Sequence, residues 1–284
     1  MSRRQQSVGY TSGPLQAGYA SNTQPDNTYT CKAQDTLYYG RFVKKGATSG
    51  SVETIMPVAN VSAATDITGT RTLFGVTMID GTRVQEPSIN DTIGGFYIDA
   101  VQAGSLLSVR SMGPIQLNCE TAMNNLSDIY IRHAARVQVQ TLVFDADLIT
   151  GNIINGEIGG VPITEVLFDT DNETTLTAIA DAIFATAGNT KIASAVSDDT
   201  DTITVTSILD VKDQNLTGWV VTGGASQAAI TIDETAGSVK SSMIGSIRND
   251  GDGGTATEIP DTMQIKIIEA ITEAGPIAAN IDIK

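Results

Sequence analysis

Basic residues are scarce in this chain, and so are the residues with which enzymes most often build nucleophiles and metal sites. Its 284 residues include 17 Lys and Arg against 32 Asp and Glu, with one His, two Cys and one Trp. A single His excludes a His-based metal cluster, and a Ser or Cys nucleophile would need that same His133 as its base. Residues 129–132, which precede it, are typical of an ordinary strand. We therefore expect no enzymatic activity and no metal or other cofactor.

Cysteine pairs and long apolar runs are also lacking. Cys31 and Cys119 lie far apart, and two Cys without close spacing define neither a zinc site nor a disulfide framework. We expect both to be free thiols. No run approaches the roughly 18 apolar residues of a membrane helix, and no apolar segment after the polar start indicates a signal peptide. The expected product is a soluble chain made in the cytoplasm, without a membrane partner.

The net charge of −15 is unevenly distributed. Residues 1–140 carry eleven Lys and Arg against ten Asp and Glu, residues 141–240 carry three against fifteen, and residues 241–284 carry three against seven. A sharp change in charge density indicates a domain boundary. The acidic middle segment is also a poor partner for nucleic acid, because neutralising phosphates requires Lys and Arg.

Residues 1–27 are rich in Ser, Gly, Gln, Thr and Pro and show no periodicity, which predicts a disordered tail or an extended arm. Scattered tyrosines favour an arm that docks on a partner. From residue 28 onward, short β segments alternate with Gly-rich turns. The expected strands are 37–43, 54–61, 73–79, 96–101, 106–110, 115–119 and 129–131, with 263–271 and 277–283 at the C-terminus. This spacing is typical of a β-barrel or sandwich.

The middle segment, 141–240, predicts a small α+β domain with one helix. Asn172 can cap that helix, Glu173 suits its first turn, and Gly188 ends it after Ala187. One apolar stripe follows helical spacing and consists of Leu176, Ile179, Ala180, Ile183, Phe184 and Ala187. The flanking strands are expected at 139–144, 149–158, 161–168, 192–196, 202–208, 219–221 and 230–232, with turns at Asn155-Gly156 and Gly159-Gly160.

The expected fold is therefore mainly β. A β-rich base, residues 28–140 plus 241–284, is interrupted by an acidic inserted domain, residues 141–240, and preceded by the arm, residues 1–27. Two acidic stretches, 249–254 and 198–201, superficially resemble calcium loops, but 249–254 departs from the EF-hand spacing. A turn or loop between strands is the simpler interpretation of each.

Two resemblances bear on function. Residues 150–156, 168–180, 192–196 and 202–206 resemble a domain that recurs in tailed-phage structural proteins. Residues 40–46, 74–77 and 265–281, with the turn-rich β run between them, resemble the layout of phage structural cement, or head decoration, proteins. In that family the closing strand follows soon after the β run, whereas about 100 residues intervene here, which favours an insertion.

The resemblance implies a virion protein on the outer surface of a phage capsid, made in the host cytoplasm, that bridges major capsid subunits and stabilises the head. It also implies a homo-oligomer, most simply a trimer. The residues expected to contact the shell are Arg3, Arg4, Tyr10, Leu15 and Tyr19 in the arm and Arg41, Lys44 and Lys45 in the base. The alternative is a head-fibre or tail-associated module that binds receptors or glycans, in which Trp219 and the acidic loops would form the site.

Overall fold

The computed structural model describes residues 27–47, 55–69, 72–78, 100–211, 213–261, 263–268 and 270–283. Strands account for 48% of it and helices for 12%, and the strands include a closed five-stranded barrel, so the expected mainly β class with a barrel is confirmed. The chain divides into two compact units, residues 1–134 with 242–284 and residues 135–241. The division falls six residues before the expected start of the insertion and one residue after its expected end.

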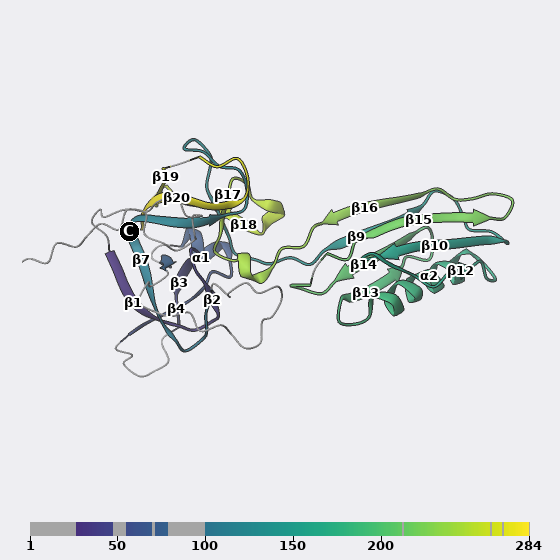
Figure 1. The fold of residues 1–284 in the computed structure, drawn as a ribbon, viewed down its shortest axis with the longest axis horizontal. Helices are drawn as coiled ribbons and strands as arrows, with labels where there is room; N and C mark the ends of the chain where they lie inside the picture. Colours follow the sequence, from purple (N-terminus) through teal and green to yellow (C-terminus); the bar gives the residue numbers. More distant parts are fainter. Residues whose placement is uncertain are drawn as a thin grey trace, which may run out of the picture. The chain divides into compact units, whose positions relative to one another are not determined.

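The first unit contains the barrel (Figure 1). Its strands, in order around the barrel, are β1 (Asn27–Ala33), β4 (Met56–Asn60), β3 (Phe42–Lys45), β5 (Leu73–Met78) and β7 (Leu106–Cys119). β7 closes the barrel because it pairs with both β5 and β1. Cys31, Val43, Val58 and Val109 belong to the cluster that fills it. A short pair, β2 (Leu37–Tyr38) and β6 (Ala100–Val101), adds Leu37 and Val101 to that cluster.

β7 continues past the barrel and organises the rest of the first unit. Its second half pairs with β20 (Gly275–Asp282), which pairs in turn with β19 (Gln264–Ile267). The strands β8 (Tyr130–Arg132), β17 (Ile247–Arg248) and β18 (Ala256–Glu258) extend the same sheet. A second core, which includes Ile115, Leu117, Ile131 and Ile277, packs there with Ile67 of the short helix α1 (Ala64–Thr68).

The second unit has two four-stranded sheets and a helix that share one core. One sheet joins β13 (Ile192–Ser197), β14 (Thr202–Ser207), β9 (Val139–Phe144) and β16 (Ile230–Ala236). The other joins β11 (Val161–Pro162), β10 (Asn152–Ile158), β12 (Val166–Leu167) and β15 (Leu216–Gly223). The helix α2 (Asn172–Ala187) contacts strands of both sheets. Two short 3-10 helices, η1 (Ser241–Met243) and η2 (Asp252–Gly254), follow later in the chain.

The predicted helix is confirmed, with two corrections. Its N-cap is Asp171 rather than Asn172, because the Asp171 carboxylate accepts the backbone N–H of Thr174. Asn172 instead accepts the backbone N–H of Leu148 through its side-chain oxygen. The apolar stripe is buried except for Phe184, whose side chain remains 36% exposed. Gly188 ends the helix with a positive φ of 77°, as expected.

Several strand predictions were wrong. Residues 37–43 and 161–168 were each expected to form one strand, but the first range contains β2 and the start of β3, and the second contains β11 and β12. β1 was not expected, because five of its seven residues are exposed and its sequence shows little apolar pattern. Residues 106–110 and 115–119 form one strand rather than two, since Gly113 adopts a φ of 108° within β7 instead of opening a turn. Asn155-Gly156 lies in the middle of β10, whereas Gly159-Gly160 does form the turn to β11.

Position 156, within the strand β10, requires a glycine because the ring of Trp219 occupies the space that a side chain would need. A Cβ atom on Gly156 would lie 2.2 Å from the Trp219 Cδ2 atom. The indole N–H donates to the Glu157 carbonyl at 3.1 Å, and the partly buried ring packs against the core of the second unit. This glycine is therefore required for packing and not for a turn.

We predict that Gly156→Ala will destabilise the second unit by about 2 kcal/mol, in the range for overpacking a core. Urea unfolding followed by Trp219 fluorescence measures this, because Trp219 is the only Trp in the chain. Gly237→Ala is the matched control, since its added Cβ would meet only the Glu234 side chain, at 3.7 Å. Equal unfolding midpoints for the two variants would contradict the packing argument.

We also predict that residues 135–241 will fold when expressed alone, because every residue of their core cluster lies within this segment. The expected result is a single cooperative thermal transition in far-UV circular dichroism. A product without a transition would show that the segment depends on the rest of the chain.

Candidate functional site

The expected shell-contact residues fall into two groups. Arg3, Arg4, Tyr10, Leu15 and Tyr19 lie outside the residues that the structure describes. Arg41, Lys44 and Lys45 lie at the start of β3 and along it, so their surroundings can be examined. These surroundings differ markedly between the three side chains.

Arg41 is inside the first unit rather than on its surface. The residue is 8% exposed, and its Nε donates to the Ser242 carbonyl at 3.2 Å. Ser242 is the residue at which the chain returns to the first unit. Because a side chain so enclosed cannot also contact a shell, Arg41 has to be removed from the expected contact set. Its basic sequence context gave no sign of this burial.

Lys44 has a partner within the barrel unit. Its Nζ lies 2.8 Å from the Asp66 carboxylate and 2.7 Å from the Ser62 hydroxyl. Burial of Asp66 opposes its ionisation, but the hydrogen bonds from Lys44 and Ser62 and the Lys44 charge outweigh this and lower the pKa of the Asp66 carboxyl. Lys45, in contrast, is exposed. Among the three base residues, Lys45 is the one best placed to meet a partner.

A buried ionic cluster lies where β7, β8, β17 and η2 meet. The Arg132 side chain is fully buried, with its Nε 2.7 and 2.9 Å from the two Glu120 oxygens and its Nη2 2.7 Å from the Asp252 carboxylate. Arg248 adds a second cation, 2.9 Å from Asp252, and also pairs with Asp250. Residues far apart in the sequence therefore form one charged network.

The cluster explains why the loop at residues 249–254 contains carboxylates. Burial opposes ionisation of Asp252, yet hydrogen bonds from Arg132 and Thr255 and the nearby arginine charges outweigh it and lower the pKa of Asp252. Its ionised form therefore stabilises the fold above the ordinary pKa of Asp, and this contribution is lost as the pH falls through the lowered value. The two carboxylates that suggested a calcium loop thus bind arginines. Across the described ranges, no group of three or more His, Cys, Asp or Glu is placed to hold a metal.

The other residues that suggested chemistry have structural surroundings. Asp198 accepts the backbone N–H groups of Thr200, Asp201 and Thr202, so residues 198–201 form a turn. Burial and the charge of Arg132 lower the pKa of the partly buried His133. Both cysteines are buried free thiols, as expected, and burial raises the pKa of Cys31 to about 11. A thiol with so high a pKa is protonated at neutral pH and is a poor nucleophile.

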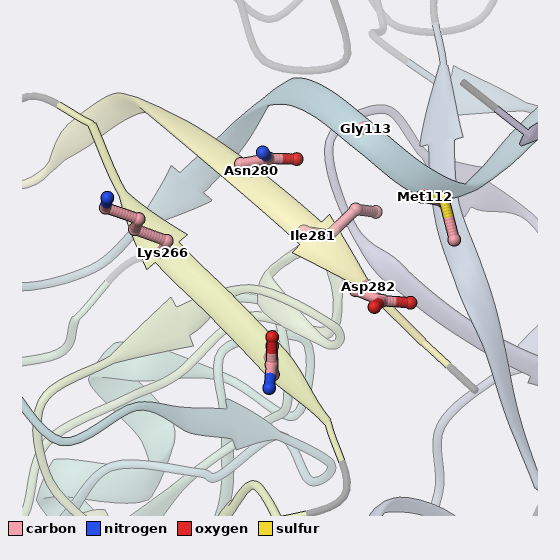
Figure 2. Close-up of a pocket in the computed structure, with 7 residues that line it drawn as sticks. Met112, Gly113, Lys266, Asn280, Ile281 and Asp282 are labelled. Carbon is pink, nitrogen blue, oxygen red and sulfur yellow. The ribbon is translucent and has the colours of Figure 1, made fainter. Parts of the chain in front are cut away.

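A shallow cavity of about 350 Å³ lies on the face of the sheet formed by β7, β20 and β19 (Figure 2). We call it the polar shelf. It is lined by Met112, Gly113, Gln264, Lys266, Asn280, Ile281 and Asp282. Strand register aligns these residues in rows, with Asp282 opposite both Gln264 and Met112, and Asn280 opposite both Lys266 and Pro114. Gln264, Lys266 and Asn280 are exposed, so the shelf presents accessible polar side chains beside Met112 and Ile281.

Gln116 lies on the same face of β7 as Met112, because alternate residues of a strand share a face. It is 8% exposed, and its Oε1 atom is buried without a hydrogen-bond partner. A buried acceptor without a donor is unfavourable. Sequence reasoning missed the shelf because β20 and β19 reach β7 only through tertiary pairing.

Comparison with known proteins identifies no family for this chain. No family model matches the chain, and a search of curated proteins found no match. Neither helix in the described part of the chain is long and apolar enough to cross a membrane.

We predict that Arg132→Met will destabilise the first unit by about 3 kcal/mol, because it removes the fully buried cation from Glu120 and Asp252 and leaves only Arg248 beside them. Urea unfolding followed by far-UV circular dichroism measures the loss. Asp250→Asn is the control, since the Asp250 side chain is 59% exposed and its pair with Arg248 is expected to contribute about 0–1 kcal/mol. A loss below about 1 kcal/mol for Arg132→Met would contradict the role of the cluster.

Proposed function

We propose that this chain is a structural virion protein that decorates the outside of a phage head and stabilises it by bridging major capsid subunits. The observation that supports this most is the division of charge between the two units. Residues 135–241 carry four Lys and Arg against fifteen Asp and Glu, a net −11, and the remaining residues carry thirteen against seventeen, a net −4. The N-terminal 46 residues are basic, with six against two. Such a chain has one end suited to an acidic partner and one unit suited to solvent.

The proposed contact combines the arm with the exposed surface of the barrel unit. Arg3 and Arg4 would supply charge, and Tyr10, Leu15 and Tyr19 would supply apolar contact area. Lys45 would add a cation from the end of β3, which is exposed at that residue. An extended arm can also add main-chain hydrogen bonds to a strand of its partner. These contacts would tie neighbouring capsid subunits together without any chemical step.

The acidic second unit would then be directed away from the shell. Its like charge would keep decorated particles apart in solution. A homo-oligomer, most simply a trimer, would let one assembly span several capsid subunits around a local symmetry axis.

The glycan-binding alternative has less support. Trp219, the aromatic residue it would use, is partly buried over Gly156 and donates its indole N–H to Glu157. A ring engaged in this way is not presented as a platform for a sugar.

We predict that deleting residues 2–26 will weaken binding to heads assembled without this protein by at least tenfold, while the remaining chain stays folded. Co-sedimentation with such heads measures binding, and circular dichroism checks the fold. The deletion stops before Asn27, because Asn27 pairs with Met112 at the start of β1.

Lys45→Glu should also weaken binding to these heads, because it reverses an exposed charge on the proposed contact surface. Lys191→Glu is the matched control, since Lys191 is equally exposed but lies in the second unit. Full binding by the truncated protein would exclude the arm as the main contact.

A further inference from the structure

β1 begins beside the polar shelf. It runs antiparallel to β7, with Lys32 opposite Leu106 and Asn27 opposite Met112. Moving back along β1 from Lys32 to Asn27 therefore moves forward along β7, toward Gly113 and beyond. Met112 is both the last β7 residue that pairs with β1 and the first β7 residue that lines the shelf. Asn27, the first residue of β1, thus lies at the edge of the shelf.

The shelf offers the groups that a polar extended segment needs. Asn280 and Gln264 are exposed amides, and Lys266 is an exposed cation. Main-chain N–H and C=O groups and Ser, Thr or Asn side chains can form hydrogen bonds with these amides. The shelf is much less suited to a second copy pairing along β19, because an outward-facing Lys on an edge strand disfavours such pairing.

The residues that immediately precede β1 in the sequence have chemistry that matches the shelf. Residues 20–26 read Ala-Ser-Asn-Thr-Gln-Pro-Asp, which supplies hydroxyl and amide donors and one carboxylate. Asp26 is the only acidic residue among the first 34 and would complement Lys266. The second half of β7 spans about seven residues, roughly 23 Å at 3.3 Å per residue, so residues 20–26 are long enough to cross it.

We propose that residues 20–26 bind across the polar shelf of their own chain. The shelf would then be an intramolecular anchor, which holds the proximal part of the arm and leaves residues 1–19 to engage a partner. This inference concerns the isolated protein and does not depend on binding to a phage head.

The test uses the chain lacking residues 2–26 and a fluorescein-labelled peptide of residues 1–26, with binding measured by fluorescence anisotropy. The expected result is saturable binding to the truncated chain and at least tenfold weaker binding to the full chain, whose own segment occupies the shelf. Equal binding to both proteins, or no binding to the truncated chain, would overturn the proposal.

A charge exchange locates the binding surface. In the truncated chain, Lys266→Glu should weaken binding of the peptide at least fivefold, and a peptide carrying Asp26→Lys should recover it. Asn280→Arg should also weaken binding, whereas Lys191→Glu should leave it unchanged. Unchanged binding by both shelf variants would place the peptide elsewhere and refute the assignment.

A second copy as the occupant of the shelf is tested with the same proteins. Sedimentation velocity of the truncated chain would then show a concentration-dependent dimer that Asn280→Arg abolishes. That outcome would also overturn the proposal. No heads are present in any of these measurements, so their failure leaves the proposed decoration function to its own test.

Discussion

The antiparallel pairing of β20 with β7 is the interaction on which the first unit depends. It runs from Gly275 opposite Cys119 to Asp282 opposite Met112. It thereby joins a strand that follows the second unit in the sequence to one that precedes it. Because β7 also closes the barrel through β1 and β5, one strand carries both the barrel and the adjoining sheet. Alternate residues of β20, including Ile277, Ala279 and Ile281, then complete the second core.

Where the chain returns from the second unit, its backbone packs closely against Phe42 and Arg132. The Phe42 N–H donates to the Gly245 carbonyl, and the Gly245 N–H donates to the Arg132 carbonyl, both at 2.8 Å. Gly245 has a φ of 83°, and a Cβ atom there would lie 2.4 Å from the Phe42 carbonyl oxygen. The Arg41 side chain donates to the Ser242 carbonyl in the returning segment, and the Arg132 side chain donates to the Thr255 hydroxyl further along it. Arg41 and Arg132 therefore stabilise the fold rather than contact a partner.

This use of arginine explains why the candidate site was only partly predictable. The sequence identified Lys45 as a basic residue near the start of the base, and the structure leaves it exposed. It gave no means to distinguish Arg41, which differs from Lys45 in burial and not in its local pattern. The ionic cluster was equally hidden, because Glu120, Arg132 and Asp252 are brought together by strand pairing and not by spacing.

Some features were determined by the sequence alone because their causes are local. The helix and its end at Gly188 follow from apolar spacing and a residue that tolerates positive φ. Two distant cysteines predicted free thiols, and the charge count predicted a boundary close to the one that the contacts define. Tertiary structure alone decided the rest. β1 is a strand because β4 and β7 pair with it, Asn155-Gly156 lies within a strand because β15 pairs with β10 there, and the polar shelf exists only where β19 and β20 meet β7. In each case the deciding contact comes from a residue distant in sequence, which no local pattern records.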